Sequence, residues 1–238
     1  TIHQALHYNA QQQHHQWQIG GKPFYVKGIT YNPRHHWRDG RWYPTRRTLE
    51  TDFTRIQAMG ANTLSWYESN HYDANVINVA TQKALKIIYN FWLDPKVDYY
   101  QDVKKRQAIK KKIIQRIRKY KDQSIIISWN LGSGTWSELE EHFHQPYLTE
   151  VRQAYTTFIN ELALTIKELD PSRPIMAGID GSRQVAGALH HYDTYAPAID
   201  IWGISAYNSV QMSHIKELMY NKYAKRAYLF SEFGSKMN

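Results

Sequence analysis

The chain has 238 residues, a formal net charge of +9 and no cysteine. This length is typical of one domain with a large apolar core, and the lack of cysteine excludes disulfides, thiolate metal sites and cysteine nucleophiles. The positive charge is concentrated in residues 104–121, whose apolar residues keep a helical spacing, so we interpret this segment as a solvated outer helix face and expect no nucleic-acid partner. No run reaches the roughly 18 apolar residues of a membrane span, so we expect none.

Short apolar runs alternate with longer segments of helical periodicity along the chain. This alternation predicts a parallel sheet covered by helices, an α/β architecture. The runs predict seven strands at 24–31, 61–67, 86–93, 124–132, 174–179, 199–207 and 226–234. The periodic segments predict helices at 49–59, 74–85, 104–121, 149–170, 182–190 and 213–223.

Two architectures fit this alternation, an open doubly wound sheet and a closed (β/α) barrel. The open sheet usually has a glycine-rich phosphate loop after its first strand, whereas here Asn32-Pro33-Arg34 follows that strand. We therefore predict a single barrel domain over residues 1–238, of the (β/α)8 TIM-barrel type, with residues 1–20 as a polar N-terminal extension. Such barrels have eight strands, so we expect this one to be incomplete, with the eighth strand unrecognised or beyond the chain.

The active site of such a barrel lies at the C-terminal ends of its strands. These ends carry aromatic, amide and carboxylate side chains, a combination that suits sugars, because flat sugar faces stack on aromatic rings and hydroxyl groups bond to amides and carboxylates. The candidate binding residues are Tyr31, Asn32, Trp66, Glu68, Trp92, Asp94, Asn130, Ser133, Trp136 and Asn208. A weaker candidate, Asp180, fits a turn equally well. We expect no cofactor, and no metal at His35-His36 or His190-His191, because adjacent side chains on an extended segment point to opposite faces.

Several motifs occur in an order that resembles a known group of enzymes. They are Gly21-Lys22-Pro23-Phe24 before the first strand, Met59-Gly60-Ala61-Asn62-Thr63, Trp129-Asn130-Leu131-Gly132, Tyr207, and Ser231-Glu232-Phe233-Gly234. From about residue 20 to 235 the chain resembles the retaining glycoside hydrolases of clan A, especially the barrel domains of families two and five. The resemblance implies an oligosaccharide or polysaccharide with β-linkages as substrate. It also implies Glu232 as the nucleophile, and Tyr207 is expected to donate a hydrogen bond to it.

The sequence departs from these families at their acid/base position. There an Asn-Glu pair follows the Trp-Asn-Leu-Gly motif, whereas this chain has Ser133 and Gly134. Retaining hydrolysis needs two carboxyl groups about 5–5.5 Å apart, so we expect impaired hydrolysis, restored by Gly134→Glu if the loop keeps the family geometry. The nearest downstream carboxylates, Glu138, Glu140 and Glu141, are interpreted as solvated residues that open a helix. The alternative is that a shifted loop swings one of them inward, with Glu138 the first candidate for the acid.

Two functional interpretations therefore remain open. The first is a glycoside hydrolase or transglycosidase with Glu232 as nucleophile; the second is a non-catalytic carbohydrate-binding domain that has kept the cleft. A third, a basic barrel that binds an acidic macromolecule, does not account for Glu232 and Tyr207. Further domains of a longer chain are possible partners. We expect a periplasmic or extracellular rather than a cytoplasmic location, although a chain without cysteine fits either.

Overall fold

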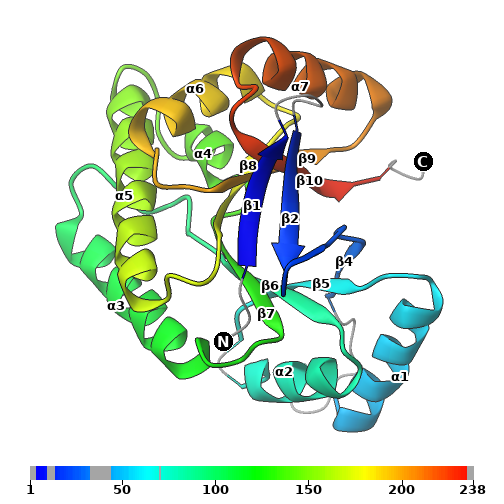
Figure 1. The fold of residues 1–238 in the computed structure, drawn as a ribbon. Coiled ribbons are helices and arrows are strands. Elements are labelled where there is room, and N and C mark those ends of the chain that lie inside the picture. Colours follow the sequence, from blue (N-terminus) through cyan, green and yellow to red (C-terminus); the bar gives the residue numbers. More distant parts are fainter. Residues whose placement is uncertain (1–3, 10–13, 33–43, 70, 235–238) are drawn as a thin grey trace.

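The computed structural model describes residues 4–9, 14–32, 44–69 and 71–234. The predicted parallel barrel is confirmed: seven strands pair side by side in parallel, in the order β10-β9-β8-β7-β6-β5-β4. Within the described part of the chain no strand pairing joins β10 to β4, so the barrel is nearly closed but open along this seam (Figure 1). The strands are β4 Gly28–Thr30, β5 Thr63–Tyr67, β6 Lys86–Phe91, β7 Ile126–Leu131, β8 Ile175–Asp180, β9 Ile201–Ala206 and β10 Ala227–Phe233.

Helices surround the outside of the sheet (Figure 1). The basic segment forms α3 as expected, and its buried Ile113, Ile117 and Tyr120 belong to the main apolar core. None of the described helices is long and apolar enough to cross a membrane. The helices are α1 Arg46–Ala58, α2 Asp73–Gln82, α3 Val103–Tyr120, α4 Thr135–Glu138, the 3-10 helix η1 Leu139–Glu141, α5 Tyr147–Leu169, α6 Val185–Tyr195 and α7 Ser209–Lys222.

The start of the chain is not a simple extension. Strands β1 Gln4–Asn9, β2 His14–Ile19 and β3 Lys22–Pro23 form an antiparallel sheet that lies across one end of the barrel (Figure 1). Trp17 of β2 is 6% exposed and packs with Ile88, Ile127, Met176 and Ile201, which lie near the N-terminal ends of their strands. The antiparallel sheet therefore covers the end of the barrel opposite the strand ends predicted to carry the site.

The two faces of each barrel strand carry different residues. Successive side chains of a strand point to opposite faces. Large residues such as Trp66, Trp129 and Trp202 are buried in the core between sheet and helices. The barrel interior instead receives small or polar residues, including Ser65 and Asn90. Because small residues do not fill the interior, a cavity remains inside the barrel.

Candidate active site

A cavity of about 420 Å³ lies among the described residues. Inward-facing residues of all seven barrel strands line it, together with the loops that follow β7 and β8. The polar members of this lining are Thr30, Thr63, Ser65, Tyr67, Asn90, Asn130, Ser133, Glu138, Asp180, Ser182, Arg183, Ser205, Tyr207, Ser231 and Glu232. The cavity thus combines amides, hydroxyl groups and carboxylates, which can form hydrogen bonds to the hydroxyl groups of a sugar.

Glu232 lies near the end of β10, where the pairing with β9 shifts by one residue between Phe230 and Glu232. Such a bulge re-aims side chains at a strand end. The hydroxyl of Tyr207 donates a hydrogen bond to Oε2 of Glu232 at 3.0 Å, as predicted from the sequence. Burial and the charge of Glu232 raise the pKa of Tyr207, so its hydroxyl stays protonated and remains a donor.

The sequence alternative for Glu232 was an ion pair that closes the barrel mouth. Among the described residues no Lys or Arg lies within 4.0 Å of its carboxylate. Lys27, one of the two cations considered, forms no ion pair there, and the other, Arg34, lies outside the described residues. The carboxylate of Glu232 is therefore held by a neutral hydroxyl group inside a cavity.

Two amides form the polar floor of the cavity. Asn130 donates through Nδ2 to Oδ1 of Asn90 at 2.7 Å, and Asn90 donates to the Ser65 hydroxyl at 2.9 Å. The buried Oδ1 of Asn130 has no hydrogen-bond partner among the described residues. A buried polar atom is normally paired, and among the described residues that line the cavity only Asn130 has such an unpaired atom.

Tyr67 was missed by the sequence analysis. Its hydroxyl lies 2.5 Å from the Ser133 hydroxyl, which brings the end of β5 next to the loop after β7. Burial raises the pKa of Tyr67, and the negative charges of Glu232 and Glu138 raise it further. Tyr67 therefore lies close to both carboxylates. The available signal was the two-residue alternation of the strand, which places Tyr67 inward if Trp66 faces the helices.

The backbone at Gly134 shows why this position carries no side chain. Its φ is +82°, a left-handed conformation that favours glycine. Its N–H donates to the carbonyl of Gly178, and a Cβ added at Gly134 would lie 3.3 Å from Cβ of Asp180. The loop is thus packed closely against β8. A glutamate would adopt this conformation only with strain, which weighs against restoration by Gly134→Glu.

Glu138 lies in the cavity lining and is only partly exposed, which differs from the solvated position expected for it. Burial and the charge of Glu141 raise its pKa, although Arg183 acts in the opposite direction. Glu140 and Glu141 lie outside the cavity lining and form ion pairs with Arg152 and Arg183. Glu138 therefore lies at the cavity, whereas Glu140 and Glu141 do not.

Four predicted binding residues at the ends of β4 and β5 do not reach the cavity lining. Trp66 is buried on the helix side, where its Nε1 donates to Asp73 of α2 at 2.8 Å. The Tyr31 hydroxyl donates to Asp52 of α1 at 2.8 Å, and Asn32 beside it is exposed. Glu68 accepts from Lys112 at 2.7 Å. Trp66, Tyr31 and Glu68 thus follow the predicted strands, but their side chains contact the surrounding helices.

Four further candidates also lie outside the cavity lining. Trp92 is 53% exposed, and Trp136 is buried under the ring-stacked guanidinium of Arg152. Asp94 accepts from the backbone N–H of Lys96, and Asn208 caps α7 by accepting from the N–H of Gln211. Of the predicted positions, the structure brings Asn130, Ser133, Gly134, Tyr207 and Glu232 together at the cavity.

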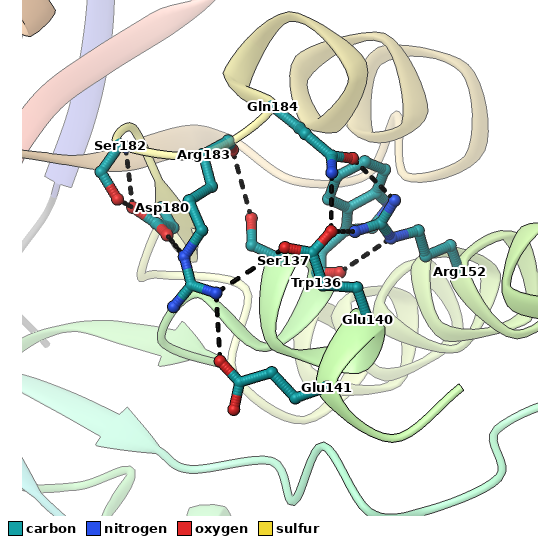
Figure 2. Close-up of polar contacts among 9 residues, drawn as sticks. All are labelled: Trp136, Ser137, Glu140, Glu141, Arg152, Asp180, Ser182, Arg183 and Gln184. Atoms are coloured by element: carbon teal, nitrogen blue, oxygen red, sulfur yellow. Dashed lines mark hydrogen bonds and ion pairs between the residues drawn. The ribbon is translucent and has the colours of Figure 1, made fainter. Parts of the chain in front are cut away.

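Asp180 and Arg183 add charge to the rim of the cavity. Asp180 accepts from both the backbone N–H and the hydroxyl of Ser182, so the turn geometry considered from the sequence is present in a cavity-lining residue. Arg183 lies within 4.0 Å of carboxylate oxygens of Asp180, Glu140 and Glu141 (Figure 2). No group of three or more His, Asp or Glu in the described part of the chain is arranged to hold a metal ion; His35-His36 lie outside that part.

Comparison with known proteins adds structural neighbours only. No family model matches the chain, and no curated protein matches it. Among solved structures, a β-glucuronidase from Bacteroides uniformis is similar with a TM-score of 0.77 at 17% identity, over 99% of this chain and 27% of that one. A GH2 β-galacturonidase from Eisenbergiella tayi has a TM-score of 0.71 at 14% identity, over 98% of this chain and 38% of its own.

A β-1,4-D-mannanase from Cryptopygus antarcticus is similar over a larger share of its own length. Its TM-score is 0.62 at 10% identity, over 87% of this chain and 72% of the mannanase. Of the β-glucuronidase and the β-galacturonidase, in contrast, this chain spans 27% and 38%. At these identities the likeness establishes the fold alone, a (β/α) barrel that this chain shares with these enzymes.

Proposed function

We propose that the cavity binds a β-linked glycan and that Glu232 attacks its anomeric carbon, as in a retaining glycoside hydrolase or transglycosidase. The observation that carries the proposal is the hydrogen bond from Tyr207 to Glu232 inside the cavity of a glycosidase-like barrel. A carboxylate can act as a covalent nucleophile when its ionised form is stabilised by a donor. Asn130 and Asn90, which line the same cavity, supply amide groups of the kind that bind sugar hydroxyl groups.

Hydrolysis of unactivated glycans is proposed to be slow unless another carboxyl group in the cavity replaces the acid at position 134. Gly134 offers no proton to a leaving oxygen, and general acid catalysis is typically worth about 10²–10⁴-fold. The same observation favours the second candidate function, in which the cavity binds a glycan without cleaving it. The two candidates differ in whether Glu232 forms a covalent bond to the sugar.

An activated substrate separates them, because a good leaving group needs no protonation. The experiment is turnover of dinitrophenyl β-glycosides, with and without azide or formate, which can replace a missing base in the second step. The panel covers glucosides, galactosides, mannosides, glucuronides and galacturonides, since the structural neighbours include enzymes named for three of these classes.

We expect turnover of at least one activated glycoside and its loss in Glu232→Gln. Stimulation of the wild type by azide or formate would show that no base acts in the second step. Binding of a glycan without turnover of any member of the panel would favour the non-catalytic function. Turnover that persists in Glu232→Gln would exclude this residue as the nucleophile.

A further inference from the structure

We propose that Glu138 is a catalytic residue of this site: it supplies the proton that Gly134 cannot supply and serves as the acid/base from the next turn of helix. This inference rests on the proposed function, because it requires Glu232 to act as nucleophile. It departs from the family pattern, in which the acid/base occupies the position of Gly134.

The helical geometry places Glu138 next to the vacant position. Gly134 is the N-cap of α4, and the backbone N–H of Glu138 donates to the carbonyl of Gly134 at 3.2 Å. This hydrogen bond places Glu138 one turn along the chain from Gly134. A Cβ at position 134 would lie 3.3 Å from Cβ of Asp180, a tight contact. Glu138, in contrast, already lines the cavity.

The carboxylate of Glu138 has the electrostatic surroundings of an acid. It lines the same cavity as Glu232, and the charges of both raise the pKa of the buried Tyr67 hydroxyl. No ion pair or hydrogen bond to its side chain is found among the described residues, unlike Glu140 and Glu141.

Several charged groups face the Glu138 side chain. They are Glu141 and His142 from η1 and its end, Asp180 from β8, and Arg183 from the loop after β8. Burial and Glu141 together raise the pKa of Glu138 despite Arg183. A raised pKa keeps a carboxyl group protonated over a wider pH range, as a general acid requires.

A network of contacts fixes the segment that carries Glu138 on both sides (Figure 2). On one side, the guanidinium of Arg152 stacks 3.9 Å from the ring centre of Trp136 and donates to its carbonyl at 3.1 Å. On the other, Arg152 and Gln184 both donate to Oε2 of Glu140, at 3.2 Å and 2.6 Å. These contacts hold α4 and η1 against α5 and the loop after β8, so Glu138 projects from a fixed support.

The proton balance of the two steps is complete with water as co-reactant. In the first step a carboxylate oxygen of Glu232 bonds to the anomeric carbon, the glycosidic bond breaks, and the Glu138 proton moves to the departing oxygen. In the second, water attacks the anomeric carbon, its proton moves to the Glu138 carboxylate, and the bond to Glu232 breaks. Both residues return to their starting state.

The test is the dependence of kcat/KM on the leaving group in Glu138→Gln, using dinitrophenyl, nitrophenyl and phenyl glycosides of whichever sugar turns over. We expect the dinitrophenyl glycoside to lose only a few-fold, because it needs no acid. We expect the phenyl glycoside to lose about 10²-fold or more, the lower end of the usual range for general acid catalysis. Azide should yield a glycosyl azide from the variant, a product that a merely structural change would not produce.

The matched control is Glu150→Gln, an exposed glutamate in the first turn of α5 with no part in the site. Equal leaving-group dependence in Glu138→Gln and the wild type would overturn the role of Glu138 but leave the proposed function intact. So would a wild type that cleaves dinitrophenyl glycosides but no phenyl glycoside. If the wild type cleaves no activated glycoside, the proposed function fails and the role of Glu138 fails with it. Circular dichroism of each variant shows whether it is folded.

Discussion

Glu232 accepts from the Tyr207 hydroxyl, interacts with Tyr67, and pairs with no cation among the described residues, and this determines what its substitution should do. In Glu232→Gln the shape is retained and no ion pair among the described residues is broken, so the melting temperature should change little. Turnover of activated glycosides should fall by more than about 10³-fold, because the covalent route is lost. Thermal unfolding and single-turnover kinetics measure the two effects. A clearly lower melting temperature with unchanged turnover would instead indicate a structural carboxylate.

The pH dependence of the wild type provides a second test at the residue scale. The nucleophile must be ionised and the acid protonated, so kcat/KM for phenyl glycosides should be bell-shaped. The descending limb should lie at higher pH than for an ordinary carboxyl group, since the pKa of Glu138 is raised by burial. In Glu138→Gln that limb should disappear while the ascending limb remains. Persistence of the same descending limb would assign it to another group.

The loop between β7 and α4 determines whether a glutamate at position 134 could act as the acid/base. Gly134→Glu would force a left-handed φ on a residue with a side chain, at a cost of roughly 1–2 kcal/mol, and would press Cβ against Asp180. We therefore expect a lower free energy of unfolding and no gain in turnover. Urea denaturation and kinetics on phenyl glycosides measure this. A gain of about 10²-fold or more in this variant would show that the loop can adopt the family geometry.

The strands show which parts of the site could be predicted from sequence. Apolar runs and motifs located the strand ends, and with them Asn130, Tyr207 and Glu232. They did not establish which side chain at each end faces inward. Trp66 was expected in the cavity, but the alternation of β5 turns it towards Asp73 and brings Tyr67 inside. The left-handed N-cap at Gly134 and the position of Glu138 at the cavity depend on tertiary packing that no local pattern contains.

At the scale of the whole molecule, the antiparallel sheet at the start of the chain was missed for a physical reason. Its strands are rich in Gln and His, so their hydrophobic pattern is weak. Among their described side chains, Trp17 is buried deeply and covers the end of the barrel away from the site. Residues 4–9 and 14–23 are thus part of the packed structure rather than an extension of it.

Trp17→Ala tests this packing. Removing a buried tryptophan typically costs about 3–5 kcal/mol, and we expect a loss in that range in urea unfolding. The matched control is Tyr25→Ala, because Tyr25 follows in the same segment but is 68% exposed. KM for activated glycosides should not change in either variant, since the site lies at the other end of the barrel. Equal stability of the two variants would show that the antiparallel sheet does not support the barrel.

The central claim is that Glu232 forms a covalent bond to the sugar. The most direct measurement is labelling with a 2-fluoro glycosyl fluoride of the sugar that turns over, followed by mass spectrometry of the intact chain and of its peptides. The fluorine slows the second step, so the glycosyl-enzyme accumulates. We predict one sugar per chain, attached to the peptide that contains Glu232, and no label in Glu232→Gln. A label on another residue, or turnover of activated glycosides with no covalent species, would contradict the account.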